Sequence, residues 1–172
     1  MAISSNTTPL IALAKIGKLT LLKQLYGTVV IPPFVKIECI DRGKAMGAAD
    51  AYEIEKASQE GWISVAQLER TWKTRANNLM QRAPIGPGEA EAIILAQAKR
   101  MPVILDDADA RAIARSLKVH HFGTVMVPYE AFIKRLIAYD ELVKILTDVS
   151  RVLWVSPAVI AEIIRRAQGA RT

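Results

Sequence analysis

Six carboxylates in this sequence lie where short apolar runs end or where the following helical patterns begin. They are Glu38, Glu89, Glu91, Asp106, Asp107 and Asp109. Carboxylates that share one cleft repel each other unless a cation neutralises them. Oxygen ligands without nearby histidine or cysteine favour a hard divalent ion, Mg²⁺ or Mn²⁺, which can orient a phosphate and activate water. The chemistry to be tested is therefore metal-dependent attack on a phosphate group.

The elements that must position these acids alternate between β-type runs and helical patterns. The β-type runs are 2–4, 28–31, 62–65, 103–105 and 119–121, and the helical patterns are 8–17, 18–27, 33–43, 47–61, 86–100, 107–117, 127–139, 140–150 and 156–168. Segment 66–86 has the weakest pattern and is expected to be a loop or a helix. Strands separated by helices predict a parallel sheet with helices on both faces, and such sheets bind ligands outside the carboxyl ends of their strands.

Each acid also has a purely structural interpretation. Glu89 and Glu91 fall in the first turn of a helical pattern, where acids stabilise the helix dipole. Asp106 is an N-cap candidate, and Asp107 is spaced to pair with Arg111 one helical turn on. What favours a metal site is that several of these acids are concentrated at the ends of predicted strands.

Charge and composition narrow the classes of partner. The chain carries 23 basic and 17 acidic residues, a net charge of +6. Four of the basic residues surround Trp72 in the stretch 69–82, which weakly favours an anionic partner such as nucleic acid. Trp72 is expected to pack in a core or interface more readily than on a base.

Several other classes lack support. The chain contains neither GxGxxG after a strand nor GxxxxGK[ST], so the common nucleotide-binding motifs are absent. The single cysteine, Cys39, is expected to be a buried apolar residue, and one cysteine suits a reducing cytoplasm. No apolar run approaches the roughly 20 residues that span a bilayer.

The ordered set of segments resembles the PIN-domain superfamily, and in particular its toxin branch and the related families of unassigned function. The resemblance rests on SSNTTPLIALAKIGKLTLLKQLYGTVVIPPFVKIECI, GPGEAEAIILAQAKR, VILDDADARAIAR and HHFGT, in that order, and covers roughly residues 2–137. It implies a three-layer α/β/α sandwich around a parallel sheet of four or five strands, with an acidic pocket for Mg²⁺ or Mn²⁺. Active members of the superfamily are metal-dependent ribonucleases.

The resemblance also implies a ligand set for the metal. The family's acidic positions fall on Asn6, Glu38, Glu89 and either Asp106 or Asp107. Residues expected around these ligands are Ser5, Thr7, Glu91 and Asp109. Active nucleases usually have aspartate where this chain has Asn6. The amide keeps an oxygen ligand, but it removes one negative charge and cannot act as a base.

The leading hypothesis is a PIN-type endoribonuclease that is the toxin of a toxin–antitoxin pair, with RNA and an antitoxin protein as partners. Lys73, Arg75 and Arg82 are expected to steer the RNA backbone. The main alternative is a degenerate PIN fold that binds nucleic acid or protein without cleaving it. A phosphatase-like metal hydrolase acting on a small molecule is the third.

The chain is expected to form a PIN-like domain over residues 1–137 and a helical extension over residues 138–172. The extension would pack on the domain or on a dimer partner, because its helices are more apolar than a peripheral helix requires. These apolar helices lead us to expect a homodimer. The single cysteine and the lack of a bilayer-spanning run lead us to expect a location in the cytoplasm.

Overall fold

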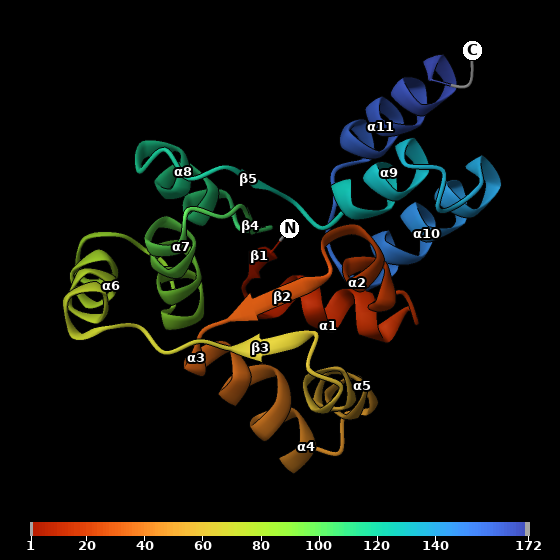
Figure 1. Cartoon of the computed structure of the whole chain (residues 1–172). Coiled ribbons are helices and arrows are strands. Elements are labelled where there is room, and N and C mark those ends of the chain that lie inside the picture. Colours follow the sequence, from red (N-terminus) through yellow and green to blue (C-terminus); the bar gives the residue numbers. More distant parts are fainter. Residues whose placement is uncertain (1, 171–172) are drawn as a thin grey trace.

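A five-stranded sheet, all of whose strands are parallel, forms the centre of the computed structural model, which describes residues 2–170 (Figure 1). The strand order is β3-β2-β1-β4-β5. The strands are β1 (Ala2–Ser5), β2 (Thr28–Ile31), β3 (Ile63–Val65), β4 (Val103–Ile104) and β5 (His121–Phe122). The first four strands match expected β-type runs, whereas β5 shares only His121 with the run expected over 119–121. The predicted α/β class and parallel sheet are confirmed.

Alternation along the strands separates two cores, one on each face of the sheet. On the first face, Ile3, Val29 and Ile104 belong to the larger core, which is covered by helices of both halves of the chain. These helices are α1 (Thr7–Lys15), α2 (Thr20–Tyr26), α5 (Ala49–Gln59), α9 (Met126–Ile133), α10 (Tyr139–Val152) and α11 (Pro157–Gly169).

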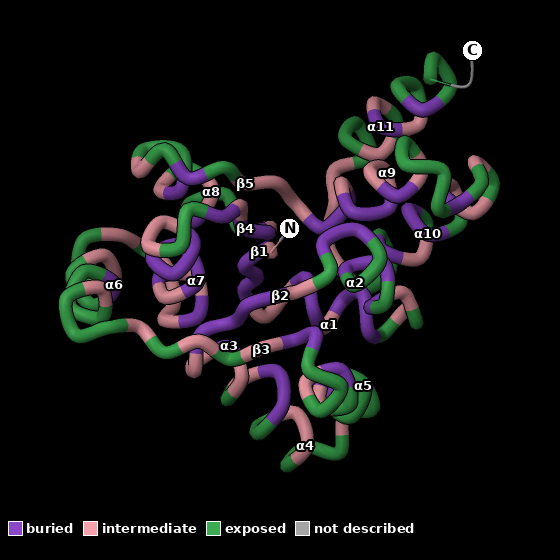
Figure 2. Tube along the Cα trace, in the orientation of Figure 1, coloured by how far each residue is buried: buried purple, intermediate pink, exposed green. Residues whose placement is uncertain are grey.

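On the second face, Val30, Val103 and Leu105 pack under α7 (Pro87–Lys99) and α8 (Ala108–Ser116). A further helix, α6 (Arg70–Arg82), lies outside α7 at the left of Figure 1. Figure 2 shows buried strands in the middle and a largely exposed α6 at the edge. The three layers expected of a PIN fold are thus present.

Between β2 and α5, the chain forms one helix of mixed geometry. It begins with α3 (Pro33–Lys36), continues as the π-helical η1 (Ile37–Arg42) and ends in α4 (Gly43–Ala45). Pro33 stands at the first helical position, where its missing N–H costs nothing. Short π-helical segments are frequent at functional sites, and this one carries a candidate ligand, Glu38.

The structure resolves one open expectation, for segment 66–86, and corrects another, for the helix expected over 127–139. The uncertain segment 66–86 contains the thirteen-residue helix α6. The helical run expected over 127–139 ends at Ile133, because Arg135 takes a left-handed conformation with φ 58°. After this break, α10 places Leu142, Ile145 and Leu146 in the same core as α1 and α2.

Candidate metal-binding and active site

A pocket of about 460 Å³ opens where the chain leaves β1 and enters α1. Its polar lining includes side chains from three separate elements: Asn6 and Thr7 after β1, Glu38 on η1, and Glu89 at the start of α7. This is the carboxyl edge of the sheet, where open parallel sheets bind ligands. The structure therefore brings together three of the five predicted ligands, together with Thr7.

Asn6 lies at the base of this pocket and is 2% exposed. Its Nδ2 donates a long hydrogen bond of 3.5 Å to Glu89 Oε1. Its Oδ1 is buried and has no hydrogen-bond partner among the described residues. A buried acceptor without a donor costs free energy, so this atom is suited to bind a donor or a cation from the pocket.

Glu38 lines the same pocket as Asn6 and is held by Thr7. The Thr7 hydroxyl donates to Glu38 Oε2 at 2.5 Å. A Cβ on Gly88 would lie 2.7 Å from the same oxygen, which is closer than atoms can approach. A side chain at position 88 would therefore displace the Glu38 carboxylate from its place beside α7.

Glu89 has one oxygen for the protein and one toward Asn6. Its Oε2 accepts a 2.7 Å hydrogen bond from the backbone N–H of Gly86, just before α7. The structural role expected of this acid, which is to stabilise the start of a helix, is thus confirmed. The other oxygen, Oε1, has only the long contact with Asn6 Nδ2 and is therefore available to a ligand in the pocket.

Two of the predicted surrounding residues do not face the pocket. Ser5 is fully buried, and its hydroxyl donates to the Asn6 carbonyl at 2.9 Å, which fixes the backbone beside the pocket. Glu91 Oε2 accepts a 3.1 Å bond from the Phe34 backbone N–H at the start of α3. Glu91 therefore caps a neighbouring helix.

Asp106 follows β4 and is bound to Thr124, outside the lining of the pocket. Its Oδ1 accepts from the Thr124 backbone N–H at 2.8 Å, and its Oδ2 accepts from the Thr124 hydroxyl at 2.6 Å. Burial raises the pKa of the Asp106 carboxyl above its ordinary value, although the Thr124 hydrogen bonds act in the opposite direction. A Cβ on Gly123 would come within 3.1 Å of Oδ1, so a glycine fits this turn.

Asp107 and Asp109 are exposed and lie outside the pocket lining. Asp107 is the N-cap of α8, where its Oδ1 accepts from the Ala110 N–H at 2.8 Å. Arg111 donates to the Asp106 carbonyl at 2.7 Å, in place of the ion pair considered for Asp107. Metal binding by Asp106 or Asp107 stays a prediction; both carboxylates have protein donors here.

Three charged residues of the pocket were missed at the sequence level. Asp50, 9% exposed at the start of α5, lines the pocket, as do Lys15 at the end of α1 and Arg42 at the end of η1. Each stands at a helix end with the sign that favours the dipole, so nothing in the sequence separates it from an ordinary terminal charge. They are identified as pocket residues only because the three-dimensional structure brings these helix ends together at one pocket.

Among residues 2–170, no three histidine, cysteine, aspartate or glutamate side chains are grouped closely enough to hold a metal ion. The pocket instead offers three separate carboxylates, Glu38, Asp50 and Glu89, and the unpartnered amide oxygen of Asn6. This all-oxygen set fits a hard divalent cation, with fewer charges than a fully acidic site would provide.

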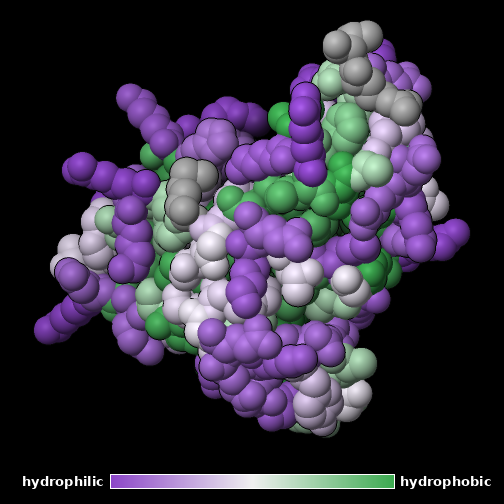
Figure 3. Space-filling model, turned by 45° about the vertical axis from the view of Figure 1, so that its right-hand side comes forward, coloured by the Kyte–Doolittle hydropathy of each residue, from purple (hydrophilic) through white to green (hydrophobic). Residues whose placement is uncertain are grey.

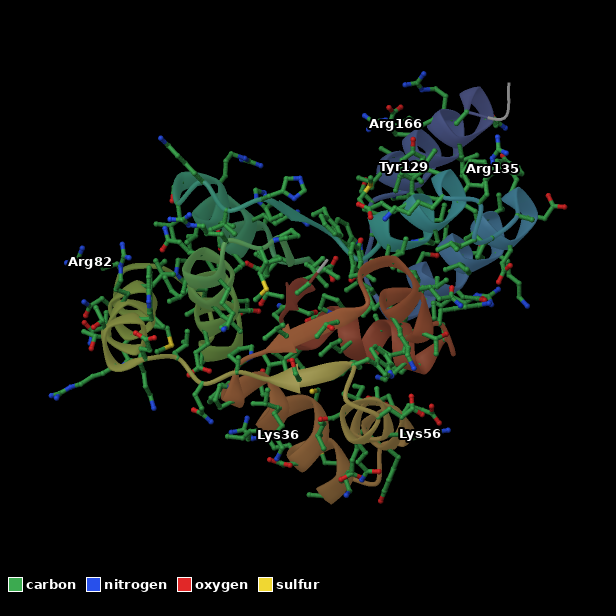
Figure 4. All side chains as sticks on the ribbon, in the orientation of Figure 1. Lys36, Lys56, Arg82, Tyr129, Arg135 and Arg166 are labelled. Carbon is green, nitrogen blue, oxygen red and sulfur yellow. The ribbon has the colours of Figure 1, made fainter. Side chains whose placement is uncertain are left out.

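The predicted nucleic-acid residues lie on α6, away from the pocket lining. Lys73, Arg75 and Arg82 are all exposed, and Figure 4 shows Arg82 at the outer edge of the molecule. Trp72 is half-buried against the cluster formed by α6 and α7, and the Arg75 guanidinium lies 4.8 Å from its ring centroid. The structural role expected for Trp72 is confirmed.

Cys39 is buried, and burial raises the pKa of its thiol to about 12, so it remains an uncharged core residue as expected. In the part of the chain that the structure describes, no helix is both long and apolar enough to cross a bilayer.

These features define a three-layer parallel α/β protein with an acid-lined pocket at the carboxyl edge of its first strand. The family model described as DUF3368, a PIN domain, matches residues 2–169. The chain therefore belongs to this PIN-domain family. The match includes α10 and α11, which the sequence resemblance had left outside at residue 137. No curated protein matches the chain.

Proposed function

We propose that this protein is a metal-dependent endoribonuclease of the PIN type. Asn6, Glu38 and Glu89 would hold a Mg²⁺ or Mn²⁺ ion, which when bound polarises a phosphate and lowers the pKa of water. The observation that carries the proposal is the buried, unpartnered Oδ1 of Asn6 in a residue that lines one pocket with two carboxylates from distant segments, Glu38 and Glu89. A cation bound in the pocket would satisfy this oxygen.

The remaining charges of the pocket support a phosphodiester substrate. Lys15 and Arg42 are exposed side chains that line the same pocket as the acids. Cations beside an acid-lined site can bind a phosphate that the acids alone would repel. Their role would be to hold and orient the RNA backbone, while Thr7 fixes Glu38 through its hydroxyl.

The test is cleavage of a long single-stranded RNA in the presence of Mn²⁺, repeated with EDTA and with Glu89→Gln. Glutamine keeps an oxygen for the Gly86 N–H but removes the charge. The matched control is Glu91→Gln, which alters a helix cap on the same helix. EDTA-sensitive cleavage that Glu89→Gln abolishes and Glu91→Gln retains supports the proposal. Cleavage that is indifferent to both EDTA and Glu89→Gln contradicts it.

The second candidate is a PIN-like domain that binds RNA or a protein without cleavage. Asn6 favours it, because an amide supplies no negative charge and cannot take a proton. In the same experiment, binding of RNA without cleavage under any metal condition would select this candidate.

The biological setting remains part of the proposal. The protein would act in the cytoplasm as the toxin of a toxin–antitoxin pair, with the α6 cations steering RNA. A homodimer would cover exposed apolar side chains near the end of the chain, namely Val152, Trp154 (87% exposed) and Val159. A small neighbouring gene for a DNA-binding antitoxin, and light scattering that gives twice the chain mass, are the results expected.

A further inference from the structure

A second cavity, of about 540 Å³, lies at the opposite edge of the sheet from the acid pocket. It opens beside the residues that lead into β4 and β5, and it reaches α2 and α9. Its walls are mainly apolar: Ala96, Met101, Pro102, Leu117, Val119 and Phe122. This volume is in the range of small-molecule sites, which are typically apolar with a few convergent polar groups. Figure 3 shows apolar surface gathered below the C-terminal helices and bordered by hydrophilic side chains.

Aromatic rings form one side of this cavity. The rings of Tyr26 and Phe122 have centroids 6.3 Å apart, and His120 meets Phe122 edge-on at 6.0 Å. The Tyr26 hydroxyl donates to Glu130 at 2.7 Å, which fixes its ring and occupies the one carboxylate of the lining. Tyr26 is only 2% exposed, so Phe122 and His120 are the rings that present surface to the cavity. Such rings suit a planar ligand.

Two exposed cations, Arg100 and Lys118, lie on the rim. They occupy equivalent places, because each follows a helix and leads into the next strand, β4 for Arg100 and β5 for Lys118. Both have left-handed backbones, with φ 52° and 57°, where glycine would be less strained. Neither forms an ion pair with another described residue. They are placed to bind an anionic group at the mouth.

Gln97 adds a buried amide to the lining. Its Nε2 donates weakly to the Leu117 carbonyl at 3.4 Å, and its Oε1 is buried without a partner among the described residues. An N–H donor from a ligand would satisfy this oxygen. All four nucleobases carry such donors on a planar edge.

We propose that this cavity binds a nucleotide. The base would lie among Phe122, His120 and the apolar walls with an N–H toward Gln97, and the phosphate would lie between Arg100 and Lys118. The same chemistry could come from a free mononucleotide or from one nucleotide of an RNA strand. The site lies on the opposite edge from the acid pocket and requires neither a metal nor cleavage, so it stands apart from the nuclease proposal.

The test is calorimetric titration of the full chain in EDTA with the four nucleoside 5′-monophosphates. The parallel ligands are the unphosphorylated nucleosides and inorganic phosphate. Arg100→Gly and Lys118→Gly remove the cations while relaxing the backbone, so the fold should survive. Each should weaken nucleotide binding about tenfold, as the loss of a charge-assisted contact would. Gln97→Met should weaken nucleotides and nucleosides alike.

The matched control is Arg135→Gly, which removes a cation from the same left-handed backbone at φ 58°. Arg135 lies among α9, α10 and α11, outside this cavity's lining (Figure 4). Nucleotide binding should be unchanged in this variant. Equal weakening by Arg135→Gly, binding of phosphate alone as tight as that of nucleotides, or no nucleotide binding at millimolar concentration would overturn the proposal.

The two sources of nucleotide are separated by competition in the same buffer. A fluorescent single-stranded RNA that is displaced by mononucleotide, and whose binding weakens in Arg100→Gly, identifies an RNA strand as the occupant. Mononucleotide binding that RNA does not compete with identifies a free nucleotide. Either result supports the site whatever the outcome of the cleavage assay, because EDTA prevents metal-dependent cleavage.

Discussion

The acids at the carboxyl edge of the sheet fall into two groups, one that lines the pocket and one that lies outside its lining. Around β1, Glu38 and Glu89 line a pocket together with Asn6, whose Oδ1 is buried without a partner among the described residues. Around β4, Asp106 and Asp107 each accept hydrogen bonds from a nearby backbone N–H. The sequence spacing does not distinguish the groups, but their position relative to the pocket does. An acceptor that the protein leaves unpartnered is available to a ligand, whereas a satisfied one stabilises the fold.

Glu38→Gln and Asp107→Asn should separate these roles most widely. Glu38→Gln removes a charge from the pocket, and RNA cleavage should fall by about 100-fold or more, because outer contacts alone cost up to that factor. Asp107→Asn keeps a good N-cap for α8 and should leave the rate within about twofold. Initial rates under Mn²⁺, with circular dichroism as the control for folding, measure the difference. Equal losses would remove the distinction between the groups.

Asp106→Ala should destabilise the fold strongly. The variant leaves the backbone N–H of the fully buried Thr124 without an acceptor, which costs about 2 kcal/mol of unfolding free energy. Asp106→Asn can still accept from that N–H and should cost less than about 1 kcal/mol. Urea denaturation of both variants in EDTA measures these differences. A neutral Asp106→Ala would contradict the structural role of this carboxylate.

The sequence was sufficient to predict the sheet and the helices around it, because apolar β-type runs and helical patterns alternate with clear punctuation. It also predicted that Asn6, Glu38 and Glu89 converge, since strand ends and helix starts meet at one edge. It did not reveal that Asp106 binds Thr124, or that Asp50 reaches the pocket. The first feature depends on the direction of a side chain after a turn, and the second depends on how the helices pack against one another. The end of α9 was missed because Arg135 breaks the helix in a conformation that usually signals glycine.

Asn6→Asp should strengthen the metal site. The added charge would raise Mn²⁺ affinity by about tenfold, since one more carboxylate faces the cation. Without metal, the new charge beside Glu89 should lower the unfolding midpoint, because two close carboxylates repel. Thermal unfolding with and without Mn²⁺ measures both effects. A variant whose unfolding midpoint is indifferent to Mn²⁺ would show that the pocket does not bind this ion.

The smallest effect is a pH dependence of stability from Asp106. The pKa of the Asp106 carboxyl is raised in the folded state, so this group binds a proton more readily in the folded protein than in the unfolded chain. Its contribution is fully present below the ordinary aspartate pKa and is lost as the pH rises through the raised value. Compared with Asp106→Asn, the wild type in EDTA should therefore lose stability over that range. Parallel pH profiles would show that burial does not control this group.

The most direct test of the central claim is Mn²⁺ binding by calorimetry, without RNA, to the wild type, Glu89→Gln and Asp107→Asn. We predict that the wild type and Asp107→Asn bind the ion alike and that Glu89→Gln loses binding. Binding retained by Glu89→Gln and lost by Asp107→Asn would place the metal in the β4 group and contradict the account.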